Sequence, residues 1–156
     1  MRNIPFSPPD ITELEIQEVC EALRSGWITT GPRTKQLEKE LAEYCHVAKL
    51  VCLNSATAAE EMNLRVLGIG EGDEVLVPEP SFVCYAPLTT ISDGVPVPIV
   101  TKAEDQFRLT PEALKAAITP KTKLLVLPYP NNPTGAIMRR EDLEGIAAVQ
   151  IGRAHV

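Results

Sequence analysis

The stretch Leu127-Pro128-Tyr129-Pro130-Asn131-Asn132-Pro133-Thr134-Gly135 decides the fold of this 156-residue chain. It follows an apolar run from Lys123 to Leu127, which has the length and composition of a buried parallel strand. The prolines exclude both a helix and a continued ladder immediately after that strand. In open α/β sheets, ligands bind at the carboxyl ends of strands, and an Asn side chain there can donate and accept hydrogen bonds. On the residues alone, a rigid proline-rich turn without a ligand is the alternative.

Helical and strand-like patterns alternate along the rest of the chain. Ile16, Val19, Cys20 and Leu23 recur with helical spacing and predict a helix that Ser25-Gly26 terminates. Further helices are expected at 37–45, 57–67, 82–92 and 111–117 and after residue 135, and strands at 50–53, 74–77, 95–100 and 123–127. This alternation predicts a parallel sheet with helices on both faces.

The turn before Thr57 has the features of an anion-binding site. A strand ending at Leu53, a turn of Asn, Ser and Ala, and a helix starting near Thr57 would present free N–H groups and hydroxyls at the positive end of a helix dipole. The same residues also fit a capping box, Thr57-x-x-Glu60, in which Glu60 reaches back to the helix start. A carboxylate one turn from a bound phosphate would weaken anion binding, so Glu60 counts against full phosphate affinity.

Composition narrows the class of protein. Fifteen basic against 21 acidic residues give a net charge of −6, which counts against nucleic-acid binding. We find no apolar run of membrane-spanning length and no secretory leader, and therefore expect a cytoplasmic protein. The cysteines do not have the spacing of metal ligands, and no metal site is predicted. We expect them to be reduced thiols in the protein core. These thiols are Cys20, Cys45, Cys52 and Cys84.

The segment Pro130–Gly135 resembles the Asn-Pro-Thr-Gly signature of class I and II aminotransferases, which use pyridoxal 5′-phosphate. The likeness extends back through Val77–Tyr85 and forward to about residue 149. In that family, the motif's Asn binds the phenolic oxygen of the cofactor, a role that the resemblance assigns to Asn132. An aromatic side chain stacks on the pyridine ring, which the resemblance assigns to Phe82. Ordinary core packing is the alternative for Phe82.

The first half of the chain resembles the DegT/DnrJ/EryC1/StrS sugar aminotransferases instead. The similar segments are Ile4–Pro9, Ser25–Pro32 and Leu53–Ala59. In that group, the Ser-Ala-Thr-Ala turn opens a helix and holds the cofactor phosphate, which implies phosphate contacts for Ser55, Thr57 and Ala58. The loop around Trp27 closes over substrate in that group, although a single Trp can also simply pack.

The two resemblances meet near residues 72–79. We therefore expect a chimeric junction there, within a partial transferase domain of residues 1–149; a single lineage that mixes both patterns is the alternative. Residues 150–156, Gln-Ile-Gly-Arg-Ala-His-Val, resemble a translated sequencing adapter, and we expect a non-native tail rather than a native segment.

The resemblance implies the α/β fold class, as an incomplete three-layer large domain of the aspartate aminotransferase-like fold with a mainly parallel sheet. Three strands expected after residue 149 would separate the strand at 50–53 from the one at 123–127. We therefore expect the first strand either to pair directly with the fourth or to leave the chain insoluble.

The function implied is transfer of an amino group from a small-molecule donor to a keto acceptor by a homodimeric enzyme that uses pyridoxal 5′-phosphate. In both resembled branches the lysine that forms the Schiff base lies after residue 149. No catalytic residue is therefore assigned, and the chain by itself is expected to be inactive and to bind the cofactor weakly or not at all. The alternatives are a fragment that binds phosphate or the cofactor without turnover, and an assembly artefact without a function.

Overall fold

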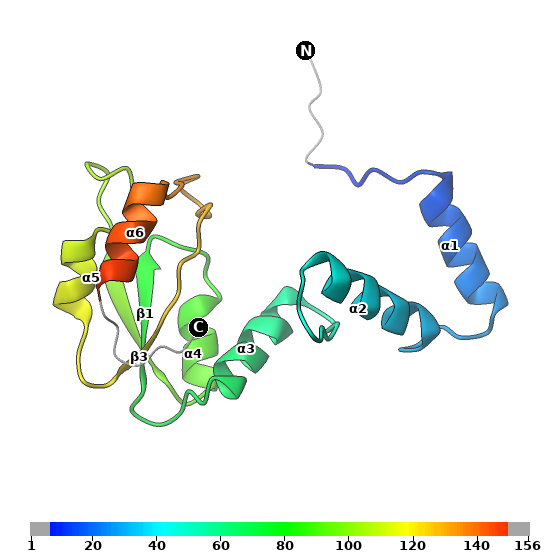
Figure 1. Cartoon of the computed structure of the whole chain (residues 1–156), viewed down its shortest axis with the longest axis horizontal. Coiled ribbons are helices and arrows are strands. Elements are labelled where there is room, and N and C mark those ends of the chain that lie inside the picture. Colours follow the sequence, from blue (N-terminus) through cyan, green and yellow to red (C-terminus); the bar gives the residue numbers. More distant parts are fainter. Residues whose placement is uncertain (1–6, 150–156) are drawn as a thin grey trace, which may run out of the picture. The chain divides into compact units, whose positions relative to one another are not determined.

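The computed structural model describes residues 7–149 (Figure 1). The chain divides into two units, one up to Cys52 and the other from Leu53 onward. The expected non-native tail at 150–156 lies outside the described residues.

The first unit contains two helices, both predicted from the sequence. Helix α1 spans Glu13–Arg24, and its start is closed by a capping box between Thr12 and Glu15. It ends at Ser25, and Gly26 follows with a φ of +73°. Helix α2 spans Pro32–Tyr44, with its proline at the first position, where a missing N–H costs nothing.

The strand predicted at Leu50–Leu53 does not form, and this prediction was wrong. The segment has no regular secondary structure, with Val51 73% exposed and Leu53 42% exposed. A parallel strand gains its hydrogen bonds only from a neighbouring strand. The sheet of the described chain has three strands, and none of them pairs with this segment. The direct pairing with the strand at 123–127 is therefore not observed.

The second unit contains the remaining helices and all three strands, in an order that confirms the alternation predicted above. The elements are α3 (Ala56–Val66), β1 (Glu74–Glu79), α4 (Tyr85–Ile91), β2 (Val95–Val100), α5 (Pro111–Ala117), β3 (Thr122–Leu125) and α6 (Arg140–Ala148). Helix α4 begins three residues later than predicted, so Phe82 lies in the loop before it.

The three strands form a parallel sheet in the order β2-β1-β3. Strand β1 is the central strand, and its interior residues are buried on both faces. One irregularity in the pairing of β1 with β3 lies beside Glu74, because Val75 pairs with Leu124 and so leaves Lys123 as the extra residue.

Two apolar clusters place a helical layer on each face of the sheet. Val75 and Val77 point into one cluster with Leu64 of α3 and Leu88 of α4. The alternate residue Leu76 points into the other cluster, which contains residues of α5 and α6. Figure 1 shows α3 and α4 on one side of β1 and α5 and α6 on the other. The three-layer architecture predicted from the sequence is confirmed.

No helix among residues 7–149 is long and apolar enough to cross a membrane.

Candidate functional site

The loops that follow β1 and β3 are hydrogen-bonded to each other at the end of the sheet where the carboxyl ends of the strands lie. This end is called the carboxyl-end edge. Both strands run in the same direction, so both loops leave at their carboxyl ends. The Nδ2 amide of Asn131 donates a hydrogen bond to the carbonyl of Pro80 across a distance of 3.2 Å. Phe82 lies two residues after Pro80, and Asn132 follows Asn131 directly. The two residues assigned to the cofactor ring are therefore carried by loops that are bonded to each other.

Asn131 holds the turn, whereas Asn132 faces outward. The Asn131 side chain is only 5% exposed, and its Oδ1 accepts hydrogen bonds from the backbone N–H and the hydroxyl of Thr134. Its backbone bonds to Gly135 and Ala136, closing the turn. Asn132 is exposed, so its amide is accessible to a ligand.

Phe82 borders a shallow hollow at this edge. Its side chain is 46% exposed, which is unlike a core phenylalanine. The hollow has a volume of about 290 Å³ and is lined by Val77, Glu79, Pro80, Ser81, Phe82, Val83 and Ala86. The accessible ring favours the stacking interpretation over core packing.

The start of α3 presents free backbone donors. Ser55 is the N-cap, with an extended backbone, and its side chain accepts a hydrogen bond from the N–H of Ala58 at 3.1 Å. The predicted capping box that begins at Thr57 does not form, so this prediction was wrong. The helix starts one residue earlier, and Thr57 lies inside its first turn. The first N–H groups of a helix have no helical partner, so this turn can receive an anion. Ser55, Thr57 and Ala58 are thus brought together by one helical turn.

Two contacts between α3 and α4 place that turn at the edge already described. The Cys84 thiol, just before α4, donates to Oε2 of Glu60 at 2.9 Å. At the other ends of the two helices, Nη2 of Arg65 donates to the carbonyl of Ile91 at 3.1 Å. The helices therefore run in the same direction. The start of α3 therefore lies toward the same end of the sheet as the loop between β1 and α4, which carries Phe82.

The opposite end of the sheet, at the amino ends of its strands, holds an ion pair. Nζ of Lys123 lies 2.8 Å from Oδ2 of Asp73 and also donates to the carbonyl of Gly68. The hydrogen bond from Lys123 lowers the pKa of the Asp73 carboxyl below its usual value. Lys123 therefore lies at the amino end of β3, away from the candidate site.

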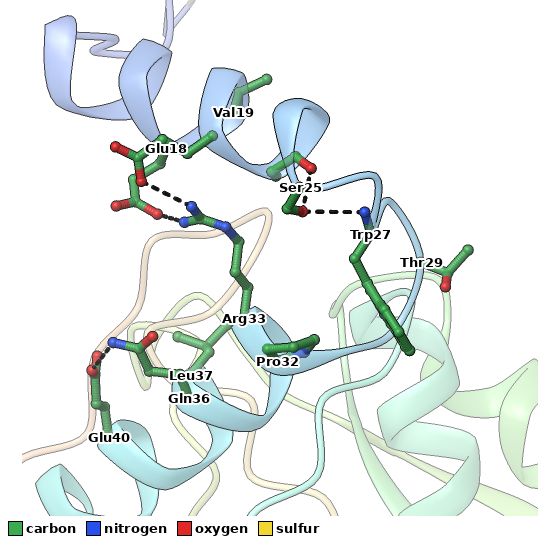
Figure 2. A pocket seen from close by; sticks show the side chains of 12 residues that line it. Glu18, Val19, Ser25, Trp27, Thr29, Pro32, Arg33, Gln36, Leu37 and Glu40 are labelled. Carbon is green, nitrogen blue, oxygen red and sulfur yellow. Dashed lines mark hydrogen bonds and ion pairs between the residues drawn. The ribbon is translucent and has the colours of Figure 1, made fainter.

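The first unit has a cleft of its own, shown in Figure 2, with a volume of about 930 Å³ between α1 and α2. Arg33 points from α2 toward Glu18 and Glu21 of α1 and pairs with both carboxylates. The Trp27 indole lies over Gly31, and its Nε1 donates to the carbonyl of Thr30 at 3.1 Å. Trp27 therefore packs on its own loop.

Two contacts that hold the site in place were not predicted from the sequence. The hydroxyl of Tyr129 accepts from the N–H of Leu109 and donates to the carbonyl of Phe107, both at 3.0 Å, which anchors the loop after β3. The second is the bond between Glu60 and Cys84, whose partners are 24 residues apart. Neither pair has a spacing that a local pattern could reveal.

Comparison with known proteins gives a family match over residues 9–148, to the DegT/DnrJ/EryC1/StrS aminotransferase family. The match runs through residues 72–79.

Solved structures of several aminotransferases are also similar to this chain. A protein named as a sugar aminotransferase, Spr1654 from Streptococcus pneumoniae, in its PMP form, is 54% identical, with a TM-score of 0.73 over 79% of this chain and 31% of that chain. An aromatic aminotransferase from Pyrococcus horikoshii OT3 is 35% identical, with a TM-score of 0.73 over 92% and 42%. The aspartate aminotransferase from Thermus thermophilus with maleate is 31% identical, with a TM-score of 0.72 over 86% and 37%. The chain spans about a third of the length of these relatives.

Proposed function

The chain belongs to the DegT/DnrJ/EryC1/StrS aminotransferase family, and from that premise we propose that it supplies the cofactor-binding edge of an enzyme that uses pyridoxal 5′-phosphate. The sugar aminotransferase from Streptococcus pneumoniae is also known in a PLP form, which supports this cofactor. When bound, the cofactor supplies a ring that withdraws electrons from an attached amino group.

The start of α3 receives the phosphate in this proposal. The hydroxyls of Ser55 and Thr57 and the N–H groups of the first turn would surround it at the positive end of the helix dipole. The N–H of Ala58 would exchange its bond to the Ser55 side chain for one to the phosphate. The amide of Asn132 would donate to the phenolic oxygen, and the ring of Phe82 would stack on the pyridine ring and exclude water from one of its faces.

The residues at this edge fit such a ligand. An aromatic phosphate needs an anion-binding turn, an apolar flat surface and a neutral hydrogen-bond donor, and all three are accessible here. The observation that carries the proposal is the bond between Asn131 and Pro80, because it joins the segment with the amide donor to the segment with the ring. The proposal leaves the Schiff-base lysine unassigned, since Lys123 is held at the opposite edge.

The substrates of the proposed enzyme are a small-molecule amino donor and a keto acceptor. The relative named as a sugar aminotransferase, at 54% identity, favours a keto sugar as the acceptor. The likeness of residues 73–149 to class I and II aminotransferases favours an amino acid as the donor. A cytoplasmic homodimer completes the proposal.

Titration of the full chain with pyridoxal 5′-phosphate, followed by calorimetry, tests this assignment. We expect saturable binding that weakens in Ser55→Ala and in Asn132→Ala. Thr110→Ala is the matched control, because Thr110 caps α5 in the same way that Ser55 caps α3, with its side chain accepting from Ala113. Absent binding, or an equal loss in Ser55→Ala and Thr110→Ala, would overturn the assignment.

A further inference from the structure

The bond between Glu60 and Cys84 connects the two helices of the candidate site at the end where the ligand would lie. Glu60 is in the second turn of α3, one turn after the segment that would hold the phosphate. Cys84 is the N-cap residue of α4 and lies two residues after Phe82. Both side chains are partly buried, and Cys84 packs against the apolar cluster that contains Leu64 and Val77.

We propose that Glu60 and Cys84 form a positioning pair, which fixes the loop carrying Phe82 against the phosphate-binding turn of α3. This inference rests on the proposed function of that edge. The thiol donates and the carboxylate oxygen accepts, so the bond survives only while the thiol keeps its proton.

The chemistry of the thiol favours this role over that of a nucleophile. Burial and the neighbouring Glu60 raise the pKa of Cys84 from 9.0 to about 11. A thiol held in its protonated form is a poor nucleophile and a persistent donor.

The carboxylate has a second effect, on charge. Glu60 is four positions after Ala56, a rise of about 6 Å along a helix axis. Its negative charge therefore opposes an anion at the start of α3, while the thiol bond directs the carboxylate toward α4. The pair thus fixes the aromatic surface in place at some cost in phosphate affinity.

Four variants separate these effects. Cys84→Ala removes the donor and keeps the charge, and Cys84→Ser keeps a donor. Glu60→Gln keeps an acceptor and removes the charge. Arg65→Gln breaks the bond to Ile91 at the far end of the same helix pair and is the matched control.

The experiment measures pyridoxal 5′-phosphate affinity by calorimetry and the order of Phe82–Cys84 by ¹⁵N relaxation, on the full chain. Cys84→Ala should lose roughly tenfold in affinity, the equivalent of one ordinary hydrogen bond, and should lower the order parameters of the loop. Cys84→Ser should match the unmodified chain in both. Glu60→Gln should keep the loop ordered and bind several-fold more tightly, and Arg65→Gln should change neither measurement.

An unchanged Cys84→Ala, or an equal loss in Arg65→Gln, would overturn the positioning role. If the unmodified chain itself fails to bind the cofactor, the proposed function fails. In that case, the order parameters of the variants still test whether Glu60 and Cys84 fix the loop that carries Phe82.

Discussion

Two neighbouring asparagines at the site have opposite surroundings, although they are the same residue type. Asn131 is buried and donates and accepts within its own turn, whereas Asn132 is exposed. The residues alone indicate only that an Asn pair follows a strand. The family resemblance selects Asn132 as the ligand-binding member, and the packing of the turn explains why the two side chains cannot exchange roles.

Asn131→Ala should destabilise the fold by about 1–3 kcal/mol, because it removes a buried donor and acceptor and leaves their partners unpaired. Thermal melting measures this change. Asn132→Ala is the control on the adjacent residue and should leave the melting temperature unchanged. Equal melting temperatures for the two variants would show that Asn131 does not hold the turn.

The pH dependence of stability should carry the signature of Cys84. Burial, followed by the bond and the charge of Glu60, raises the pKa of the folded thiol from 9.0 to about 11. The folded chain therefore holds this proton more tightly than the unfolded chain does. The thiol's contribution to stability is complete below pH 9 and is lost as the pH rises toward 11.

Cys84→Ser isolates this effect, because a serine hydroxyl does not titrate in that range. The difference in melting temperature between the unmodified chain and Cys84→Ser should be constant from pH 7 to 8.5. Near pH 10.5 the melting temperature of the unmodified chain should fall relative to that of Cys84→Ser. A difference that is independent of pH would contradict the raised pKa.

At the scale of elements, β2 is an outer strand of the sheet, and its unpaired side lacks hydrogen-bond donors at two positions. The N–H of Val95 donates to the carbonyl of Asp73, just before β1, and the N–H of Thr101 donates to Glu79, the last residue of β1. Alternate residues of β2 therefore face β1, and Pro96 and Pro98 face the outer edge. Proline has no N–H, so this outer edge lacks donors at both positions and resists pairing with another strand.

Pro98→Val should restore a donor to the outer edge of β2 and increase self-association. Sedimentation velocity at increasing protein concentration measures this change. Pro87→Val, at an exposed position within α4, makes the same chemical change away from the sheet and is the control. The edge argument fails if both variants sediment like the unmodified chain.

The elements that sequence patterns predicted well are those whose partners are encoded nearby. Helix α5 has its cap at Thr110 and its proline at the first position, and β2 has the predicted bounds of 95–100. The segment at 50–53 has an equally apolar pattern yet forms no strand, because a strand depends on its neighbours in the sheet rather than on its own residues.

At the scale of the whole molecule, the two units differ in what holds them together. The unit from Leu53 onward contains both apolar clusters and the sheet. In the first unit, no residue of α1 or α2 is buried. Stability in this chain should therefore be concentrated after residue 53.

Limited proteolysis tests this distribution. We expect early cleavage within the exposed segment 46–54 and a resistant product that begins near residue 54. Mass spectrometry of the products gives the cleavage sites. Cleavage that begins in β1 or α4 would contradict the expected order of stability.

The chimeric junction near residues 72–79 remains a proposal at this scale. Residues on both sides contribute to one cluster, since Leu64 and Ile69 belong to the same cluster as Leu88. Long-read sequencing of the source DNA across codons 70–80 would decide between a junction and a single lineage.

In the proposed function, three separate segments form one binding site for an aromatic phosphate. Titration of the ¹⁵N-labelled chain with pyridoxal 5′-phosphate, followed by amide chemical shifts, tests it most directly. The account predicts that Ser55–Ala58, Phe82 and Asn132 shift together with one dissociation constant. Shifts confined to the cleft around Trp27 and Arg33, or separate dissociation constants for the three segments, would contradict it.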